Sequence, residues 1–337
     1  MAENGSERQG SHTVVPMDVS ICILTRNQPE LLPRCVASCI AEVQRAGVKA
    51  EVIVVDNASA DGNPQKVALL SPLVRVVRNE EDLGFAAGNN KAIRMSQGRY
   101  VLILNDDAWL EEGSLRLLLQ ELDSNPRAGA VGPRLLNPDG SLPKNFTNRR
   151  LPRVRAVACE FLGLEAVMER SAFTRDLFTH NRGADVSGEA EHIAGACLLA
   201  RREALEGIGL FDEGFRYWFE DCDLCYRLRK AGWDLIYLRE AQVVHYSSAS
   251  LGKLTRLERD TMCFTSMMYY FRKHSSPAKY LAIRMMLALV VLVRGPLAAL
   301  HRVWRGGWTR QEWFDAIGRS LRAVRLLLLK SLSSGRG

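Results

Sequence analysis

The sequence has no apolar stretch long enough to cross a lipid bilayer. The most apolar part of its C-terminal third, Met285–Val293, is nine uncharged residues between two arginines, whereas a spanning helix needs about 20 residues. Residues 1–13 are polar and lack the apolar core of a secretory signal peptide. We therefore expect a protein that is neither membrane-spanning nor secreted, with residues 1–16 as a disordered tail.

Two familiar phosphate-binding motifs are also missing. The sequence contains neither GxxxxGK[ST], the P-loop of many nucleotide hydrolases, nor the GxGxxG of dinucleotide-binding proteins. Gly84 and Gly88 are spaced differently from the glycines of either motif. These absences remove the main support for a simple nucleotide hydrolase or a dehydrogenase.

The cysteines do not form the pattern of a disulfide framework or a zinc site. All eight are scattered along the chain, and several lie inside apolar runs, which predicts buried thiols in a reducing cytosol. Cys222 and Cys225 form a lone CxxC with no second pair, so we expect no zinc or redox role for them.

Charge is distributed unevenly along the chain. Residues 272–337 hold 13 Lys or Arg and 2 Asp or Glu, a formal charge of +11, so the preceding 271 residues carry −4 of the net +7. A basic C-terminal region on a mildly acidic body predicts an anionic surface as partner.

The first half of the chain alternates short apolar runs with helical patterns. This alternation predicts an α/β fold built on a mostly parallel sheet with right-handed crossovers. The apolar runs show little polar alternation, as expected for strands with both faces covered by helices. Strands are predicted at 18–24, 51–55, 74–77, 100–104 and 193–200, and helices at 29–45, 64–70, 85–96, 114–123 and 202–208.

The chain from residue 131 onward is less regular. Prolines and glycines mark turns up to Pro143, and residues 145–190 have weak periodicity, which predicts a partly helical insertion over the site. A helix is predicted from Glu220 to Gly232, which has the character of a C-terminal capping residue. Two strands then follow, at 233–238 and 243–244.

Polar clusters follow the strands of the predicted sheet. In an open α/β sheet, ligands bind at the carboxyl ends of the strands, so these clusters should converge on one crevice. They are Thr25 and Asn27, Asp56 and Asn57, Gly84–Asn90, and Asn105–Asp107.

A second acidic group follows an aromatic run late in the chain. Glu220, Asp221 and Asp223 lie at the start of a predicted helix, and His245 ends a nearby strand. Two sets of carboxylates that face one another require a cation, and hard oxygen ligands suit Mg²⁺ or Mn²⁺, commonly held together with substrate phosphates.

Each of these groups also has a purely structural interpretation. Acids are favoured at helix N-termini, where the helix dipole stabilises them. Asp56 and Asn57 could build a turn, Asn105–Asp107 could cap the following helix, and His245 could be a core histidine. Asp223 is expected to pair with Arg227, four residues along the helix.

The motifs, taken in order, resemble those of a family 2 glycosyltransferase with the GT-A fold. Within that family the chain is similar to the rhamnosyltransferase-like branch of bacterial cell-surface polysaccharide synthesis. The matching segments are VSICILTRN (19–27), EVIVVDNASADG (51–62), NEEDLGFAAGNNKAI (79–93), YVLILNDDAWL (100–110), NPDGSL (137–142), GLFDEGFRYWFEDCDLCYRLRKAGW (209–233) and VVHYSSAS (243–250).

The resemblance implies a role for each motif and a division of the chain. It implies a GT-A catalytic domain at 17–252, divided into a nucleotide half (17–125) and an acceptor half (126–252), followed by a basic helical region at 253–337. Asn105–Asp107 takes the place of the metal-binding DxD motif, with Asp107 as the metal ligand. The other implied roles are Thr25, Asn27, Asp56, Asn57, Gly84, Asn89 and Asp106 for the nucleotide sugar, Asp221 with Glu220 for catalysis, and His245 for the metal or diphosphate.

The implied reaction is an inverting sugar transfer. Asp221 would remove a proton from an acceptor hydroxyl, and its base strength would rise if Glu220 and Asp223 repelled its charge. The favoured donor is dTDP-rhamnose among the NDP-sugars, and the acceptor is a lipid-linked or polysaccharide hydroxyl in cell-envelope glycan synthesis. An alternative is a non-catalytic sugar-nucleotide-binding or scaffold subunit, because Asn105 replaces the first DxD aspartate.

The C-terminal region has the pattern of amphipathic helices. One is predicted at 261–274 and a second at 310–332, and Gly295–Pro296 should interrupt the helical pattern between them. Basic amphipathic helices with tryptophan lie in membrane interfaces that contain anionic lipid. We expect a cytoplasmic protein, peripheral on the inner membrane, with no nucleic-acid partner. The alternative is that these helices pack on the catalytic domain or on a second subunit.

Overall fold

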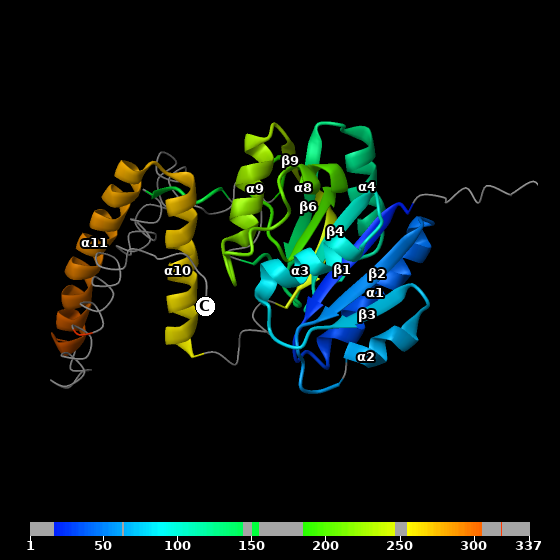
Figure 1. Ribbon diagram of the computed structural model, residues 1–337, viewed down its shortest axis with the longest axis horizontal. Helices are drawn as coiled ribbons and strands as arrows, with labels where there is room; N and C mark the ends of the chain where they lie inside the picture. The colour runs from blue at the N-terminus through cyan, green and yellow to red at the C-terminus, as the bar shows by residue number, and fades with distance from the viewer. Residues whose placement is uncertain are drawn as a thin grey trace, which may run out of the picture.

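The computed structural model describes residues 17–62, 64–143, 150–154, 185–246, 255–304 and 318 (Figure 1). The predicted N-terminal tail, nearly all of the insertion at 145–190, and the helix expected at 310–332 lie outside the described residues, except for a few positions.

The nucleotide half forms four parallel strands in the order β3-β2-β1-β4. Their β-branched and leucine side chains are almost all buried, because helices cover both faces of the sheet. The strands are β1 (Val19–Thr25), β2 (Ala50–Asp56), β3 (Val74–Arg78) and β4 (Tyr100–Asn105), and the helices are α1 (Leu31–Ala46), α2 (Pro64–Val67) with the 3₁₀ turn η1 (Ala68–Leu70), and α3 (Gly84–Met95).

The acceptor half extends the same nine-stranded sheet but makes it mixed. Strand β8 is antiparallel to both β4 and β6, and β9 is parallel to β6 but antiparallel to β5 and β7. Two elements after β4, β5 (Ala108–Leu110) and α4 (Ser114–Ser124), still belong to the nucleotide half. The acceptor half contains β6 (Ala128–Leu136), β7 (Gly188–Glu189), β8 (Cys197–Arg201), α8 (Arg202–Gly207), α9 (Glu220–Lys230) and β9 (Asp234–His245).

Three element predictions are wrong. The strand expected at 193–200 begins only at Cys197, because residues 193–196 form the loop that carries Gly195. The strands expected at 233–238 and 243–244 are one strand, β9, because a register shift between Pro133 and Arg134 of β6 lets the chain pass residues 239–241 without leaving the sheet. The break expected at Gly295–Pro296 does not occur, because α11 (Pro277–Trp304) runs through it. A proline removes one helical hydrogen bond, and the helix-forming residues on both sides keep the helix continuous.

Two apolar cores fill the two faces of the sheet. The first contains the buried faces of α1 and α4, and the second contains those of α3, α8 and α9. The seven cysteines in the described part of the chain are free thiols, and five of them are buried, as the sequence predicts. Burial raises the pKa of Cys22 to about 12, so this thiol is inert packing rather than a nucleophile.

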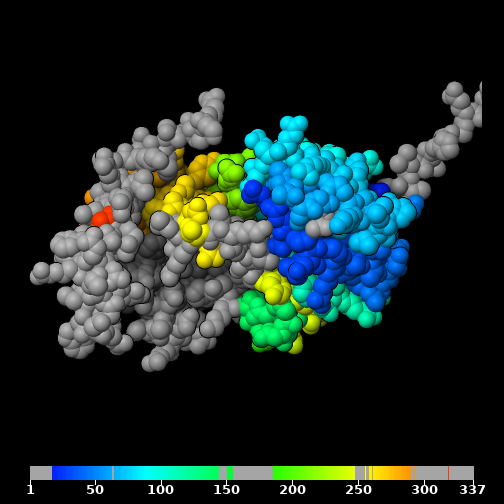
Figure 2. Space-filling model, turned by 90° about the horizontal axis from the view of Figure 1, so that it is seen from below, coloured from blue at the N-terminus to red at the C-terminus, as the bar shows by residue number. Residues whose placement is uncertain are grey.

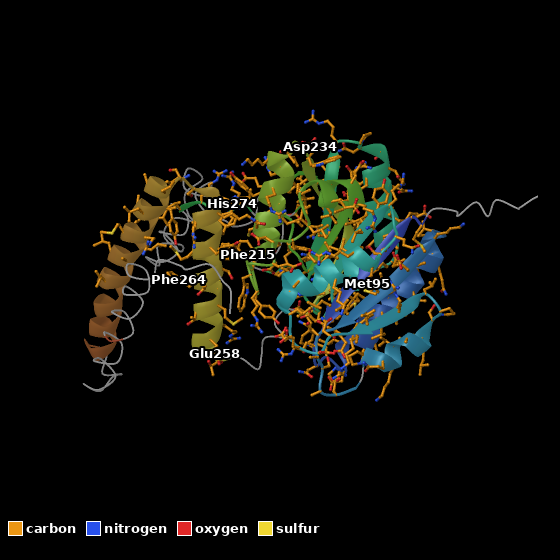
Figure 3. The ribbon with its side chains drawn as sticks, in the orientation of Figure 1. Met95, Phe215, Asp234, Glu258, Phe264 and His274 are labelled. Atoms are coloured by element: carbon orange, nitrogen blue, oxygen red, sulfur yellow. The ribbon has the colours of Figure 1, made fainter. Side chains whose placement is uncertain are left out.

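The C-terminal helices pack together and against the acceptor half. Helix α10 (Arg256–His274) begins at a capping box between Thr255 and Glu258, and α11 folds back along it. A third apolar cluster joins both helices to Phe215, which lies with His274 between α10 and the catalytic domain (Figure 3). Figure 2 shows the nucleotide half, coloured blue to cyan, on the side of the molecule opposite to α10 and α11. No described helix meets the length and hydropathy of a membrane span.

Candidate active site

The ends of three parallel strands bring the predicted polar residues to one edge of the sheet. Thr25 at the end of β1 is in register with Asp56 at the end of β2. On the other side of β1, Leu24 is in register with Asn105 at the end of β4. The convergence predicted from the sequence therefore follows from the strand register itself.

Asp56 and Asn27 also build the turns that follow their strands. The carboxylate of Asp56 is fully buried and accepts a hydrogen bond from the backbone N–H of Ser59 at 2.8 Å. It also lies 3.4 Å from the guanidinium of Arg78. Asn27 adopts a left-handed backbone conformation, and its side-chain oxygen accepts a hydrogen bond from the backbone N–H of Ala60 at 2.8 Å. The turn-building interpretation of Asp56 is thus present in the structure alongside its place in the crevice.

Asp82 connects the loops on this edge, and sequence reasoning missed it. Its carboxylate accepts hydrogen bonds from Asn57 Nδ2 at 2.6 Å and from Arg26 Nη1 at 2.6 Å. It also accepts one from the Tyr217 hydroxyl at 3.1 Å, 135 residues away in sequence. Asp82 follows two other acids, Glu80 and Glu81, and no local pattern distinguishes it from them.

Gly84 joins the two halves of the molecule at the start of α3. Its φ of +79° is left-handed, and a Cβ at this position would lie 2.8 Å from the carbonyl oxygen of Arg216. The next residue, Phe85, donates its backbone N–H to that same oxygen at 2.8 Å. A glycine is therefore required for this contact between the α3 start and the loop before α9.

Two buried oxygens on this edge have no hydrogen-bond partner among the residues that the structure describes. They are Thr25 Oγ1 and Asn89 Oδ1, on side chains that are 1% exposed. The amide nitrogen of Asn89 donates to the carbonyl of Phe85 at 3.0 Å, which fixes the orientation of its side chain. Unsatisfied buried polar atoms are rare, and these two lie where the sequence predicts a nucleotide.

The residues in the DxD position meet His245 across the sheet. Strand β5 pairs with β9 so that Ala108 is opposite His245, and His245 Nε2 lies 3.1 Å from Asp107 Oδ1. Both side chains are buried, at 5% and 3% exposure. Asn105 Nδ2 lies 3.3 Å from the same imidazole nitrogen, and Asp106 Oδ2 accepts the backbone N–H of Arg26 at 3.3 Å. An imidazole and a carboxylate held together in a buried site suit a divalent cation.

The helix-capping alternative for this segment is wrong. Helix α4 begins after Gly113, which makes no side-chain cap, and Asn105–Asp107 precede a separate strand, β5. The two aspartates are therefore at the strand edge for a reason other than capping α4.

Asp221 is placed by an unusual backbone turn. Trp218 and Phe219, directly before α9, both have left-handed φ angles of 64° and 66°, which are strained for aromatic residues. Asp221 Oδ1 accepts the N–H of Cys222 at 2.8 Å, and Oδ2 accepts the N–H of Gly195 at 3.0 Å. Its side chain remains 22% exposed, so a hydroxyl can reach it.

A short loop joins Asp221 to the strand-end residues. Gly195 donates to Asp221, and the carbonyl of the next residue, Ala196, accepts the backbone N–H of Asn105 at 3.0 Å. Asp221 and the backbone of Asn105 therefore contact two consecutive residues of one loop, which places the start of α9 next to the Asn105–Asp107 segment.

Glu220 differs from Asp221 in its environment. Glu220 is buried, and this burial, followed by the charge of Asp221, raises the pKa of Glu220 well above its usual range. Its Oε2 has no hydrogen-bond partner within the described chain. The neutral form is thereby favoured, which suits an acid that stays protonated better than a base.

Asp223 is the centre of a buried ionic network that ties α10 to α9. It pairs with Arg227 at 2.7 Å, as the sequence predicts, and also with Lys273 at 2.8 Å and His274 at 2.7 Å. Burial opposes its charge, but the hydrogen bonds from His274 and Lys273 and the charge of Arg227 outweigh it and lower the pKa of Asp223. Because the charges of Arg227 and Lys273 lie against Asp223, the expected repulsion of Asp221 by Asp223 is weakened.

His192 is the second residue that the sequence did not reveal. It is 2% exposed, and its Nε2 lies 3.1 Å from Asp221 Oδ2. His192, Asp221 and Cys222 place one potential ligand atom each within 4.8 Å of one another.

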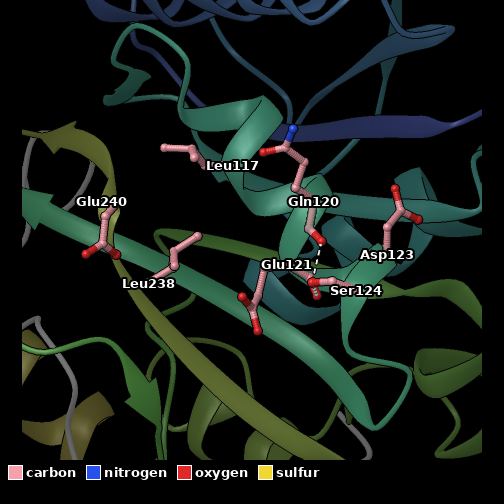
Figure 4. A pocket seen from close by; sticks show the side chains of 7 residues that line it. All are labelled: Leu117, Gln120, Glu121, Asp123, Ser124, Leu238 and Glu240. Atoms are coloured by element: carbon pink, nitrogen blue, oxygen red, sulfur yellow. Dashed lines mark hydrogen bonds between the residues drawn. The ribbon is translucent and has the colours of Figure 1, made fainter.

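A hollow elsewhere, between α4 and β9, contains none of the predicted site residues (Figure 4). It is lined by Leu117, Gln120, Glu121, Asp123, Ser124, Leu238 and Glu240.

Known proteins are similar to this chain in sequence and in fold. The model of the family described as "Glycosyl transferase family 2" matches residues 20–209. A Mycobacterium tuberculosis protein named "N-acetylglucosaminyl-diphospho-decaprenol L-rhamnosyltransferase" is 32% identical over 218 residues, which cover 60% of this chain and 68% of that protein. The "O-antigen biosynthesis protein RfbC" of Myxococcus xanthus is 28% identical over 69% of this chain, and the match spans 17% of that protein.

One solved structure resembles nearly the whole chain. It is the mannosyltransferase PcManGT from Pyrobaculum calidifontis, described in complex with GDP-Man and Mn²⁺. The TM-score is 0.53 at 18% identity, over 94% of this chain and 89% of that one. A likeness at this identity concerns the fold, and it confirms the GT-A architecture expected from the motifs.

Proposed function

Because the chain belongs to glycosyl transferase family 2, and is therefore a glycosyltransferase, we propose that it transfers a sugar from an NDP-sugar to an acceptor hydroxyl with inversion of configuration. The observation that carries this proposal is the meeting of Asp221 and the Asn105–Asp107 segment across Gly195 and Ala196. A single displacement needs one base on the acceptor side and charge neutralisation on the leaving-group side, and this arrangement offers both.

Asp221 is the base in this proposal. It takes the proton of the acceptor hydroxyl as that oxygen bonds to the anomeric carbon and the bond from this carbon to the diphosphate oxygen breaks. Its partial exposure and its two backbone hydrogen bonds support this role, because they leave the carboxylate accessible and fix its direction. Glu220 remains the second candidate, but its raised pKa and deeper burial make it the poorer base.

Asp107 and His245 would hold Mg²⁺ or Mn²⁺ at the diphosphate. The fit rests on their 3.1 Å approach and their burial, because two protein ligands plus substrate phosphates suffice for such an ion. When bound, the cation would neutralise the charge that develops on the departing diphosphate. Asn105 places an amide beside the same imidazole, where it can orient His245.

The nucleotide would occupy the edge formed by the ends of β1 and β2 and the start of α3. The buried Thr25 Oγ1 and Asn89 Oδ1 support this placement, because a ligand would satisfy them. Asn57 acts mainly through other loops, since its side chain bonds Asp82 and the backbone N–H of Leu83. The remaining residues assigned to the nucleotide sugar are Asn27, Asp56, Gly84 and Asp106.

The favoured donor is dTDP-rhamnose, and the favoured acceptor is a lipid-linked glycan of the cell envelope. The support is the similarity to a rhamnosyltransferase whose name specifies a diphospho-decaprenol acceptor, and to a protein named for O-antigen biosynthesis. An acceptor of this kind requires access to a membrane surface from the cytoplasmic side.

The exposed face of α11 offers such access. Leu281, Met285, Leu289 and Leu292 lie at helical spacing and are between 41% and 62% exposed. The opposite face, with Ile283 and Leu287, is buried in the cluster shared with α10. An apolar stripe beside basic residues is typical of helices that lie in an anionic membrane interface, and Lys279 and Arg284 supply the basic charge.

The membrane proposal is tested by flotation of the full chain with phosphatidylglycerol–phosphatidylcholine vesicles. A triple variant, Leu281→Ser, Met285→Ser and Leu289→Ser, should lose binding. The control variant Leu69→Ser with Leu70→Ser removes exposed apolar side chains from the catalytic domain and should bind like the parent. Equal flotation of the stripe variant and the parent would refute the membrane role of α11.

The competing function is a sugar-nucleotide-binding or scaffold subunit without turnover. The discriminating experiment incubates the full chain with a panel of NDP-sugars and Mn²⁺ and follows slow donor hydrolysis. The enzyme should release NDP, EDTA should abolish the release, and Asp107→Asn should weaken it strongly. Donor binding with no release from any sugar, under conditions where the chain is folded, would favour the scaffold.

A further inference from the structure

His192 occupies a position that an ordinary core histidine does not. It comes directly before the loop that carries Gly195 and is 2% exposed. Its Nε2 lies 3.1 Å from Asp221 Oδ2, but off the axis of a well-formed hydrogen bond, and neither ring nitrogen has a hydrogen-bond partner among the described residues. Buried polar atoms without a partner are rare and destabilising, so the position calls for an explanation.

Among the described residues, the carboxylate in contact with the ring is that of Asp221. His192 also lines a small cavity of about 10 Å³, together with Gly132 and Pro133. Glu191, the acid next to it in sequence, turns away and pairs with Arg153 at 2.9 Å. The titratable groups that face the histidine from the neighbouring elements are Asp221, Cys222 and Cys225 of α9, Cys197 of β8 and Tyr237 of β9.

Among these groups, Asp221 supplies the negative charge that faces the histidine. Burial raises the pKa of Tyr237 to about 12, and burial raises the pKa values of the Cys197 and Cys225 thiols even further. The weak thiol of Cys222 lies in the same three-residue group, one position along the helix from Asp221. The imidazole is therefore paired in space with the carboxylate that the proposed function makes the base.

We propose that His192 is a positioning residue and second proton site for Asp221, so that the base of this enzyme is an Asp–His dyad. The proposal rests on the proposed function, because it assigns His192 to the same reaction. Gly195 N–H and His192 Nε2 both approach Asp221 Oδ2, while Oδ1 accepts the N–H of Cys222. These contacts orient the carboxylate, and the imidazole lies next to its Oδ2 atom.

The proton has a defined route through the dyad. As the acceptor O–H bond breaks, its proton goes to Asp221 while the acceptor oxygen bonds to the anomeric carbon. Nε2, 3.1 Å from Asp221 Oδ2, then takes this proton, and the pair is left as a carboxylate and an imidazolium. The proton departs to solvent after the product leaves, which restores the neutral histidine and the charged aspartate.

An aspartate that acts alone is a weak base for this reaction, and the dyad would make it more effective. A carboxylate with an ordinary pKa is a weak base toward a sugar hydroxyl, and proton transfer works best when the base titrates near the working pH. With His192 beside it, the carboxylate can pass the proton on rather than hold it. The dyad must be unprotonated to act, so the acid limb of the kcat profile should shift when His192 is replaced by a residue that cannot take a proton.

The test compares His192→Gln and His192→Phe with the full-length parent, using an NDP-sugar donor and measuring kcat, donor KM and the pH profile. Glutamine keeps a polar group beside Asp221 but cannot take a proton, whereas phenylalanine offers neither. We expect kcat to fall about 10-fold for His192→Gln and about 100-fold for His192→Phe, with donor KM within about twofold. The acid limb should move to lower pH in both.

The control is Tyr237→Phe, at a residue that lines the same cavity but has no part in the proposed reaction, and its profile should match that of the parent. For His192→Gln, an unchanged acid limb together with a kcat within about twofold of the parent would overturn the proposal. If His192→Phe does not fold, the result with His192→Gln alone tests the proposal. If Asp221→Asn remains active, the base assignment itself fails. If Asp221→Asn is inactive and His192→Gln is unaffected, only the dyad fails.

Discussion

The two halves of the catalytic domain hold their functional residues in different ways. In the nucleotide half, strand register brings most of the polar residues to one edge, and their side chains bond within a turn or to a neighbouring loop, as when Asp56 accepts the N–H of Ser59 and Asn27 that of Ala60. In the acceptor half, Asp221 is held by Gly195 from another loop, faced by His192, and preceded by two strained aromatic residues. The nucleotide side is therefore placed mainly by strand register, and the acceptor side by contacts between segments that are distant in sequence.

This difference predicts where each half is fragile. A site placed by strand register should tolerate loss of one contact, because the register still places its residues. A site assembled from several segments should fail when one connection between segments is cut. Three substitutions test this contrast, and their expected effects range from loss of stability to a small change in donor KM.

Asp223→Asn should have the largest effect on folding. It removes the buried charge to which Arg227, Lys273 and His274 are each bonded. Breaking a buried ionic network costs about 3–5 kcal/mol. Thermal and urea unfolding would show the loss, and limited proteolysis should cut near α10. The matched control is Asp234→Asn, whose partly exposed pair with Arg127 should be worth about 0–1 kcal/mol.

The same network predicts how acid affects α10. Because folding lowers the pKa of Asp223, the folded protein holds its carboxylate in the charged form more strongly than the unfolded chain does. This stabilisation is present above about pH 4, the pKa of an unfolded aspartate, and is lost as the pH falls through the lowered value. The difference in stability between the parent and Asp223→Asn should thus shrink below about pH 4. A constant difference down to about pH 2 would contradict this assignment.

Gly84→Ala should have an intermediate effect that falls mainly on activity. Its Cβ would lie 2.8 Å from the carbonyl of Arg216, so the contact between α3 and the loop before α9 must open. Gly113→Ala is a matched control, because Gly113 has a similar φ of +80° but nothing within 4 Å of the added Cβ. Both should lose about 1–2 kcal/mol of stability through the left-handed backbone. Only Gly84→Ala should lower kcat/KM, by about 10-fold or more, since it displaces the segment that carries Asp221. Equal kcat/KM in the two variants would show that the contact does not position the base.

Asp82→Asn should have the smallest effect. The amide keeps the size of the side chain and can still accept from Tyr217 or Gly84, but it loses the charge that attracts Arg26. We expect donor KM to rise about two- to fivefold with kcat nearly unchanged, because partly exposed ion pairs contribute about 1 kcal/mol or less. A fall in kcat with unchanged KM would mean that Asp82 acts on the acceptor side instead.

Most of the nucleotide half could be predicted from the sequence, for a physical reason. Apolar β-branched runs specify buried strands, and a parallel sheet brings the residues after those strands together. The break expected in β9 came from its charged residues Arg239 and Glu240, and the sheet accommodates residues 239–241 through a register shift. The break expected at Gly295–Pro296 came from local propensity, which the surrounding helix formers outweigh.

Asp82 and His192 could not be predicted from any local pattern. Asp82 meets Tyr217 across 135 residues, and His192 meets Asp221 across a helix boundary and an intervening loop. Both residues sit in short polar segments whose composition is ordinary for loops. Their partners are specified by tertiary packing, which periodicity and spacing do not encode.

The central claim is that Asp221 takes the proton of the acceptor while the other half of the site binds the donor. The most direct measurement compares donor affinity and turnover in Asp221→Asn, using thermal shift with NDP-sugar and Mn²⁺ for binding and product formation for turnover. We predict an unchanged donor affinity and a loss of turnover of about 100- to 10,000-fold. Turnover within about tenfold of the parent would contradict this claim and would direct attention to Glu220.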